Sequence, residues 1–188
     1  MTVRPVIKSK IRKRILHIRK EKNNKNIKLS FLKVFNEIKN KISKNKIIGG
    51  YYPVNFEIDI LEILESLEKK IGVQISLPVI KKNNEMDFYY WSTKSLLKLN
   101  KFGIPEPEKI KKVLPDVIFV PIVAFDNRLY RIGYGGGYYD RYIQKLSTKK
   151  KNFFKVGIAH SSQKITQVPI NKYDKKLDII ITEKNTLR

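Results

Sequence analysis

The sequence predicts an α/β fold: a single three-layer domain over residues 1–188, with a central, mostly parallel sheet and helices on both faces. Two observations lead to this expectation. Short apolar runs alternate along the chain with longer segments of helical periodicity. The length of 188 residues is typical of one domain, and no internal repeat, low-complexity block or linker divides the chain.

Four segments repeat apolar residues at the spacing of a helix. They cover about residues 5–21, 31–42, 60–71 and 138–146. The first is strongly basic on its polar side. Ser30 and Asp59 are suited to cap the second and third helices, and Gly72 is suited to end the third.

Six short apolar runs have the length and composition of buried strands. They are residues 47–52, 73–77, 88–91, 117–120, 156–159 and 179–182. We expect Pro78 to end the second run, because proline cannot donate to a sheet ladder. The run 117–120 lies between two prolines and is the most apolar of the six.

The composition excludes several classes of protein. The chain has no cysteine and only two histidines, which excludes a disulfide framework, a thiol nucleophile and a Cys- or His-rich metal site. No stretch without Asp, Glu, Lys or Arg exceeds ten residues, whereas a membrane-spanning helix needs about 20 apolar residues. The N-terminus lacks the apolar segment of a signal peptide. We therefore expect a cytoplasmic protein with no membrane partner.

The formal net charge of +23 has three possible explanations. Of the 40 basic residues 32 are Lys, and Ile and Asn are also abundant, which is the signature of A/T-rich codons on a solvated surface. The charge could also serve a polyanionic partner, although nucleic-acid recognition favours the scarcer Arg. It could also attract a small anionic substrate. We favour the first explanation and expect no specific nucleic-acid partner.

The most informative segment is a glycine-rich loop. Glycines at 133, 135, 136 and 137 lie between the apolar run 117–120 and the last predicted helix. Glycine lets backbone N–H groups approach an anion, and a helix N-terminus adds partial positive charge. Asp140, in the first helical turn, can hold a Mg²⁺ that bridges phosphates. The alternative is a plain turn that uses glycine at positive φ.

The segment Arg131-Ile-Gly-Tyr-Gly-Gly-Gly-Tyr-Tyr-Asp-Arg141 resembles the signature of the 5-formyltetrahydrofolate cyclo-ligase family, also called 5,10-methenyltetrahydrofolate synthetases. The resemblance covers nearly the whole chain. Other segments follow the family's order, among them Gly103-Ile-Pro-Glu-Pro107 and Val120-Pro-Ile-Val-Ala-Phe-Asp126. One departure is Tyr134, which stands where many members carry a cation.

This resemblance implies an ATP- and Mg²⁺-dependent ligase that converts 5-formyltetrahydrofolate to 5,10-methenyltetrahydrofolate, ADP and phosphate. ATP phosphorylates the formyl oxygen to give an iminium phosphate, and the second folate nitrogen then displaces the phosphate. The protein's task is mainly alignment and neutralisation of charge. A monomer is expected, with 5-formyltetrahydrofolate and ATP as its ligands.

The resemblance also implies residue roles. The nucleotide-binding residues are Lys8, Arg12, Arg131, Gly133, Tyr134, Gly135, Gly136, Gly137, Tyr138 and Tyr139. The folate-binding residues are Tyr52, Glu57, Met86, Phe102 and Tyr138. The Mg²⁺ ligands are Asp140 and Asp174. A carboxylate such as that of Glu57 suits the pterin, because it can accept both of the ring's adjacent N–H donors.

Each of these residues also has an ordinary structural alternative. Lys8 and Arg12 could be solvated helix charges, Asp140 and Glu57 acids at the start of helices, and Asp174 a turn residue. The apolar members of the folate set could be core side chains. Two other functions also remain open at this point, namely a basic nucleic-acid-binding protein and a related enzyme with an altered substrate.

Overall fold

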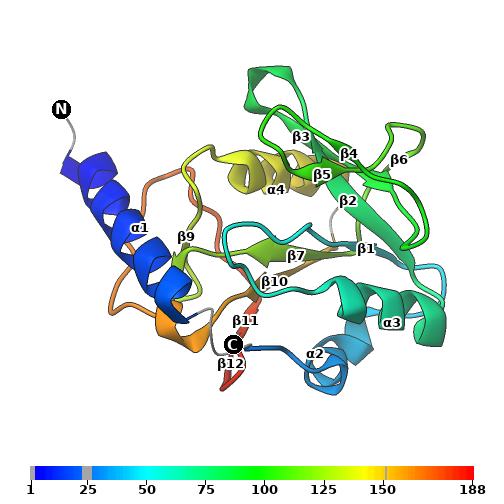
Figure 1. Cartoon of the computed structure of the whole chain (residues 1–188), viewed down its shortest axis with the longest axis horizontal. Helices are drawn as coiled ribbons and strands as arrows, with labels where there is room; N and C mark the ends of the chain where they lie inside the picture. The colour runs from blue at the N-terminus through cyan, green and yellow to red at the C-terminus, as the bar shows by residue number, and fades with distance from the viewer. Residues whose placement is uncertain (1–2, 23–26, 151) are drawn as a thin grey trace.

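The computed structural model describes residues 3–22, 27–150 and 152–188 (Figure 1). Its main sheet has eight strands in the order β12-β11-β10-β7-β1-β2-β3-β6. In chain order these strands are β1 (Ile47–Gly49), β2 (Gln74–Ile80), β3 (Met86–Tyr90), β6 (Lys112–Val113), β7 (Val117–Pro121), β10 (Phe154–Ile158), β11 (Ile179–Ile181) and β12 (Thr186–Leu187). The five strands from β11 to β2 are parallel, and β12, β3 and β6 are antiparallel to their neighbours.

The α-helices cover both faces of this sheet, as expected. They are α1 (Val3–Lys22), α2 (Phe31–Ile38), α3 (Leu61–Ile71) and α4 (Tyr138–Lys149). Short 3₁₀ helices are η2 (Lys39–Lys41), η3 (Lys82–Asn84) and η4 (Ser161–Gln163). Figure 1 shows α4 on one side of the sheet and α2 and α3 on the other. The predicted α/β class with a mostly parallel sheet is confirmed.

The central strand β7 shows why two helical layers are needed. Side chains alternate between the two faces of a strand. Val117 and Phe119 pack in the cluster that contains α2 and α3, whereas Ile118 and Val120 pack in the cluster that contains α4. All four are fully buried. A strand that is apolar on both faces requires cover on both faces.

Helix α1 packs elsewhere, beside a small hairpin of β8 (Ala124–Phe125) and β9 (Arg131–Ile132). Its Ile15 belongs to a third buried cluster with Val123, Ala124 and Ile132. Figure 1 shows α1 at the end of the molecule where β9 lies. The apolar stripe predicted for the first helix therefore serves to dock it onto this hairpin.

The expectation that Pro78 ends its strand is wrong, because β2 continues to Ile80. The carbonyl of Ser76 accepts from Gly50 N, and Ile80 N donates to the side chain of Glu106. The backbone N–H and C=O groups of these alternate residues of β2 therefore point away from β3, toward the β1 side. Pro78 faces that same side beyond the end of β1. Its missing N–H therefore costs no ladder bond.

The helix boundaries differ from the sequence expectation by small amounts. Ser30 caps α2 by accepting from Lys33 N at 3.2 Å, as expected, but the helix tightens into η2 after Ile38. Ile60, rather than Asp59, occupies the cap position of α3, although the Asp59 carboxylate still accepts from Leu61 N at 2.8 Å.

Two hairpins have strands of only two residues and have no counterpart in the sequence expectation. One joins β4 (Lys98–Leu99) and β5 (Pro105–Glu106), and the other joins β8 and β9. The second hairpin lies between β7 and the glycine loop, so the loop emerges from β9 rather than directly from the central sheet.

The connections leaving β1 and β7 define where a ligand site is expected. After β1 the chain runs through α3 to β2, and after β7 it runs through the hairpin and α4 to β10. The two helices lie on opposite faces of the sheet, so the neighbouring strands β1 and β7 form a topological switch point. Open α/β sheets bind ligands in the crevice at the carboxyl ends of such strands.

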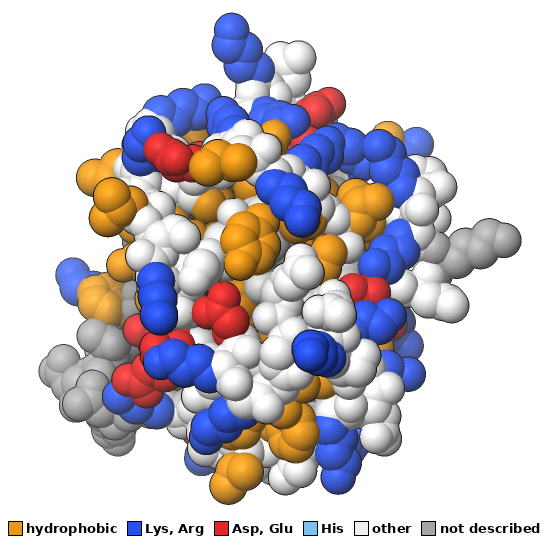
Figure 2. All heavy atoms as spheres, turned by 90° about the vertical axis from the view of Figure 1, so that its right-hand side faces the viewer, with side chains coloured by type: hydrophobic (Ala, Val, Ile, Leu, Met, Phe, Trp, Pro, Cys, Tyr) orange, Lys and Arg blue, Asp and Glu red, His pale blue; other side chains and the backbone are white. Residues whose placement is uncertain are grey.

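The basic residues are distributed rather than concentrated on the face shown in Figure 2. There, Lys and Arg side chains are interspersed with apolar, acidic and neutral ones. Within the described ranges, no helix is long and apolar enough to cross a membrane.

We predict that Gly49→Ala will lower the free energy of unfolding by roughly 1–3 kcal/mol, because a Cβ would overpack a rigid site. That Cβ would lie 2.7 Å from a ring carbon of buried Phe88 and 3.0 Å from Pro115 Cγ. Urea denaturation measures the change. The matched control is Gly133→Ala, where a Cβ meets nothing within 4 Å and φ is not positive. Equal stability of the two variants would contradict this account.

Candidate active site

The hairpin β8–β9 is held by the buried carboxylate of Asp126. It accepts from the backbone N–H groups of Arg128, Tyr130 and Val168 at 3.0, 3.2 and 2.9 Å. The Arg128 guanidinium adds bonds of 2.9 and 2.7 Å. Burial alone would raise the pKa of Asp126, but these hydrogen bonds outweigh burial and lower its pKa. The hairpin is thereby fixed to the segment around Val168.

A second carboxylate joins the hairpin to α4. Arg131, which is 6% exposed, donates to Asp140 Oδ1 at 3.0 Å and to the carbonyl of Lys175 at 2.7 Å. The amide of Lys175 returns a 3.0 Å bond to Asp140 Oδ1. Both ends of the glycine loop are therefore held: one by β9, the other by the first turn of α4.

The glycine loop between these anchors depends on its lack of side chains. Gly135 and Gly137 have φ of 108° and 66°, which favour glycine. A Cβ on Gly136 would lie 2.5 Å from the ring of Tyr138. The loop ends at the N-terminus of α4, whose first N–H groups have no partner within the helix. This arrangement is suited to an anion.

Helix α1 brings two cations to this loop from the other end of the chain. Arg12 donates from Nε to the carbonyl of Gly133 at 2.7 Å, and its guanidinium lies beside Gly135. Lys8 forms a 2.6 Å ion pair with Asp174. Burial lowers the pKa of Arg12. Their spacing predicted that Lys8 and Arg12 share one face of the helix. Both side chains do point toward the glycine loop and the neighbouring Asp174.

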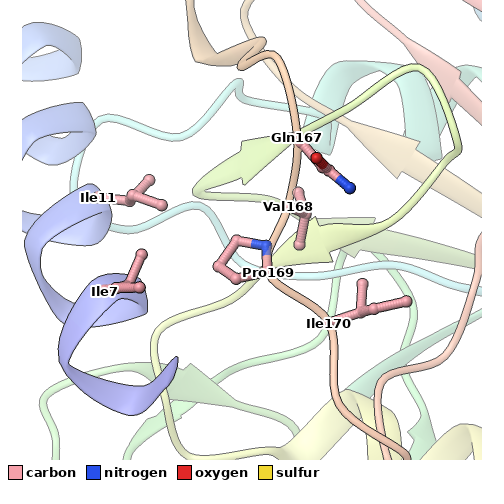
Figure 3. A pocket seen from close by; sticks show the side chains of 6 residues that line it. All are labelled: Ile7, Ile11, Gln167, Val168, Pro169 and Ile170. Atoms are coloured by element: carbon pink, nitrogen blue, oxygen red, sulfur yellow. The ribbon is translucent and has the colours of Figure 1, made fainter. Parts of the chain in front are cut away.

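An apolar pocket of about 370 Å³ lies beside these cations (Figure 3). It is lined by Ile7 and Ile11 of α1 and by the segment 167–170. Figure 3 shows the two isoleucines on the side of α1 that faces this segment. The pocket therefore places apolar surface within one helical turn of Lys8 and Arg12.

Glu57 lies on the loop that follows β1, and a buried polar cluster surrounds it. Its Oε2 accepts from Val54 N at 2.9 Å, whereas Oε1 is buried and makes no hydrogen bond to the described residues. Burial raises the pKa of Glu57, opposed by the Val54 amide, the Tyr134 hydroxyl and the charge of Arg19. The glycine loop and the loop after β1 thus meet at the switch point.

The other residues expected to bind folate lie in different surroundings. Met86 is 4% exposed and shares the α4-side cluster with Tyr138, whose hydroxyl donates to Asn84 at 3.2 Å. Phe102 is 55% exposed and lies in the turn between β4 and β5. Tyr52 is half-buried, just after β1. Met86 therefore offers little surface to a ligand, and Phe102 offers much.

Asp140 and Asp174 are the residues expected to bind Mg²⁺. They lie near one another, since Asp140 accepts a hydrogen bond from the amide of Lys175, the residue that follows Asp174. Across the described ranges there is no group of three or more His, Cys, Asp or Glu side chains placed to hold a metal. Mg²⁺ commonly uses one or two carboxylates together with substrate phosphates and water. A pair of carboxylates beside a glycine loop that is suited to an anion fits that chemistry.

Tyr139 is directed inward rather than toward the loop surface. Its hydroxyl is buried and has no hydrogen-bond partner among the described residues. Burial raises its pKa, and the negative charge of Glu57 adds to the effect. Of the two tyrosines that begin α4, Tyr139 thus faces the Glu57 cluster, while Tyr138 contacts Asn84.

Two residues of the site were missed by sequence reasoning, Arg19 and Asp126. Arg19 continues the helical spacing of Lys8 and Arg12, so a stripe at i, i+4 and i+11 could have identified it. Asp126 precedes a polar turn between apolar residues, a pattern typical of an Asx turn. Arg141, the last residue of the glycine signature, flanks the loop with positive charge in the sequence, and it donates to the carbonyl of Asn84 at 2.6 Å.

The fold and this loop define an α/β protein with a glycine loop and arginine side chains at the switch point of its sheet. The sequence profile of the 5-formyltetrahydrofolate cyclo-ligase family matches residues 4–183. The chain belongs to this family. The family predicted from the sequence, and with it the prediction of an enzyme, is confirmed.

Individual relatives agree with this assignment. The chain is 33% identical over 155 residues to the 5-formyltetrahydrofolate cyclo-ligase of Haemophilus influenzae, covering 78% of this chain and 80% of that protein. It is 36% identical over 135 residues to a probable 5-formyltetrahydrofolate cyclo-ligase of Schizosaccharomyces pombe, covering 63% and 66%. The solved structure of Aquifex aeolicus 5,10-methenyltetrahydrofolate synthetase matches with a TM-score of 0.78 at 33% identity, covering 97% of this chain and 92% of that one.

We predict that Asp126→Asn will lower the free energy of unfolding by roughly 2–3 kcal/mol at neutral pH, because it removes a buried acceptor of charge-assisted bonds. The folded-state pKa of Asp126 is lowered, so its stabilisation is present above the unfolded pKa of about 3.9 and is lost as pH falls through the lower folded value. The difference between wild type and variant should therefore narrow below about pH 4.

Urea denaturation at several pH values tests this prediction. The matched control is Glu62→Gln, since the Glu62 side chain is 84% exposed and should change stability little at any pH. A difference for Asp126→Asn that stays constant across the acid range would contradict the role given to its charge.

Proposed function

We propose that this protein uses ATP to convert 5-formyltetrahydrofolate to 5,10-methenyltetrahydrofolate, with release of ADP and phosphate. The observation that carries the proposal is the meeting of two sites at the switch point. Arg12 reaches the glycine loop on one side, where Lys8 pairs with Asp174, and the buried carboxylate of Glu57 lies on the neighbouring loop. The proposal retains the expectation of a monomeric, cytoplasmic enzyme without a specific nucleic-acid partner.

The nucleotide phosphates would bind the glycine loop. The loop offers backbone N–H groups and the N-terminus of α4, and Arg12 and Lys8 neutralise charge from α1. The apolar pocket of Figure 3, lined by Ile7 and Ile11 of the same two turns of α1, supports a position for the adenine base there. Binding at these points would present the γ-phosphate to the loop that carries Glu57.

The folate pterin would bind at Glu57. Oε1 is buried and makes no hydrogen bond to the described residues, and it lies near Tyr134, whose side chain is 39% exposed. An ionised carboxylate accepts a charge-assisted bond from the pterin N–H groups. The enzyme would thereby fix the folate with its formyl group toward the phosphates.

The chemistry then proceeds in two balanced steps. The formyl oxygen attacks the γ-phosphorus while the bond to the ADP oxygen breaks, which leaves an iminium phosphate. The N10 nitrogen adds to the formyl carbon and loses its proton, and the carbon–oxygen bond breaks to release phosphate. Alignment and charge neutralisation account for the catalysis, since the transferring phosphoryl group needs little covalent help from a protein.

Asp140 and Asp174 would hold the Mg²⁺ that accompanies ATP, which neutralises phosphate charge when bound. Among the described residues, the hydrogen bonds of these carboxylates use Oδ1 of Asp140 and Oδ2 of Asp174. The other oxygen of each is therefore available. Arg131 and Lys8 keep the two carboxylates oriented.

We expect ADP release only when 5-formyltetrahydrofolate is present, because the folate oxygen is itself the phosphoryl acceptor. A coupled assay for ADP, run with absorbance at the methenyl-folate band, should give one product for each ADP. A rate of ADP release that does not depend on the folate would refute the proposed reaction.

We expect Asp140→Asn to raise the Mg²⁺ concentration needed for half-maximal turnover by about tenfold or more. Asparagine keeps the Oδ1 acceptor that holds Arg131 and Lys175, so the loop anchor should persist while the charge is lost. Titration of turnover against Mg²⁺ measures this. The control Glu65→Gln removes an exposed acid that pairs with Lys69 on α3. An unaltered Mg²⁺ titration for Asp140→Asn would remove it from the metal site.

A further inference from the structure

Arg19 is a buried cation for which the proposed reaction has no assigned role. It is 2% exposed on the inner side of α1. Its Nη1 donates to the carbonyl of Ile122 at 3.2 Å, and Nη2 donates to the hydroxyl of Tyr134. The guanidinium carbon lies 5.7 Å from the centre of the Tyr134 ring. Its Nε is buried and has no hydrogen-bond partner in the described part of the chain.

A buried guanidinium requires a compensating negative charge, because desolvating an unpaired charge costs several kcal/mol. No direct ion pair within 4.0 Å joins Arg19 to a described carboxylate; the charge that acts on it is that of Glu57. Tyr134 lies between them, since its hydroxyl accepts from Arg19 and also interacts with the Glu57 carboxylate. Arg19, Tyr134 and Glu57 thus form one chain of polar contacts.

The two oxygens of Glu57 are not equivalent in this chain. Oε2 is held by the amide of Val54, which fixes the carboxylate at one point. Oε1 is buried and makes no hydrogen bond to the described residues. A buried acceptor without a partner is costly, so its presence calls for an explanation such as a catalytic role, an ordered water or an ion.

We propose that Arg19 is a positioning residue: through Tyr134 it keeps Glu57 ionised and oriented so that Oε1 is ready to accept a hydrogen bond from the pterin. The inference rests on the proposed function, because it concerns how the folate site is prepared. The three cations on this side of α1 would then have two roles. Lys8 and Arg12 would bind the phosphates, and Arg19 would prepare the folate site.

The other charged or titratable groups around Glu57 do not change their protonation state near neutral pH. The charged or titratable neighbours are Arg19 from α1, Tyr51 and Asp59 from its own loop, Tyr134 from the glycine loop and Tyr139 from α4. Burial raises the pKa of all three tyrosines, so they stay neutral. Asp59 is exposed to solvent. A change of folate affinity in this range therefore reports on Glu57.

The test measures binding of 5-formyltetrahydrofolate without ATP to the wild type, Arg19→Met and Tyr134→Phe between about pH 5.5 and pH 8.5. Removing the positive charge raises the pKa of Glu57, so the carboxylate becomes protonated at a higher pH. We expect affinity for Arg19→Met to fall as pH falls, and to be about tenfold weaker than wild type near pH 6. Tyr134→Phe should change the profile in the same direction.

Glu57→Gln provides the decisive comparison. Its folate affinity should be weak and should lack the pH dependence of Arg19→Met, and adding Arg19→Met to it should change affinity no further. Arg14→Met is the matched control, because Arg14 is an exposed arginine on the same helix. Tyr134 is 39% exposed, so Tyr134→Phe keeps the test valid if Arg19→Met does not fold.

Two results would overturn the inference. One is a pH profile for Arg19→Met and Tyr134→Phe that matches the wild type. The other is a loss of affinity on adding Arg19→Met to Glu57→Gln that equals the loss caused by Arg19→Met in the wild type. Such a loss would show that Arg19 acts independently of Glu57. Failure of the wild type to bind 5-formyltetrahydrofolate would instead refute the proposed function itself, so the two failures are distinguishable.

Discussion

The buried carboxylate of Asp126 is the contact on which the geometry of the site depends. It receives three backbone N–H groups and two bonds from Arg128, and these donors come from the β8–β9 hairpin and from the segment at Val168. The glycine loop emerges from this hairpin, and the Val168 segment forms the wall that faces α1. Because charge-assisted bonds are short and directional, one side chain fixes two surfaces relative to each other. Arg12 and Lys8 of α1 then meet a loop and a carboxylate whose positions are already fixed.

Tyr134 links the two halves of the proposed site physically. It belongs to the loop that would hold the phosphates, yet its hydroxyl bonds to Arg19 and interacts with Glu57. Any movement of the loop upon nucleotide binding would therefore reach the carboxylate proposed for the pterin. The two ligands would share one set of contacts, which provides a route for binding of one to alter affinity for the other. Arg19 and Tyr134, which take part in these contacts, lie 115 residues apart in the chain.

The sequence was most informative where a periodic pattern was long. The helices and the doubly buried strand β7 follow from such patterns, because burial on one or both faces leaves a repeat in the chain. The two-residue strands β8 and β9 leave no repeat, so the hairpin that carries the glycine loop could not be predicted. Pro78 was misjudged because its nitrogen faces a side of β2 where no partner strand continues. Glu57 followed from resemblance to a family, but its link to Arg19 through Tyr134 depends on the docking of α1, which no local pattern contains.

Arginine and lysine are distributed differently in this highly basic chain. Only 8 of the 40 basic residues are Arg, and five of these contact the hairpin, the glycine loop or the start of α4: Arg12, Arg19, Arg128, Arg131 and Arg141. The planar guanidinium can hold several acceptors in fixed directions, which lysine cannot. Lysines instead surround isolated acids, as where Lys81, Lys112 and Lys145 all pair with buried Asp87. The lysine-rich surface contributes a positive long-range field, which salt screens. The short-range geometry that would distinguish ATP and a folate from other anions is built from the few arginines.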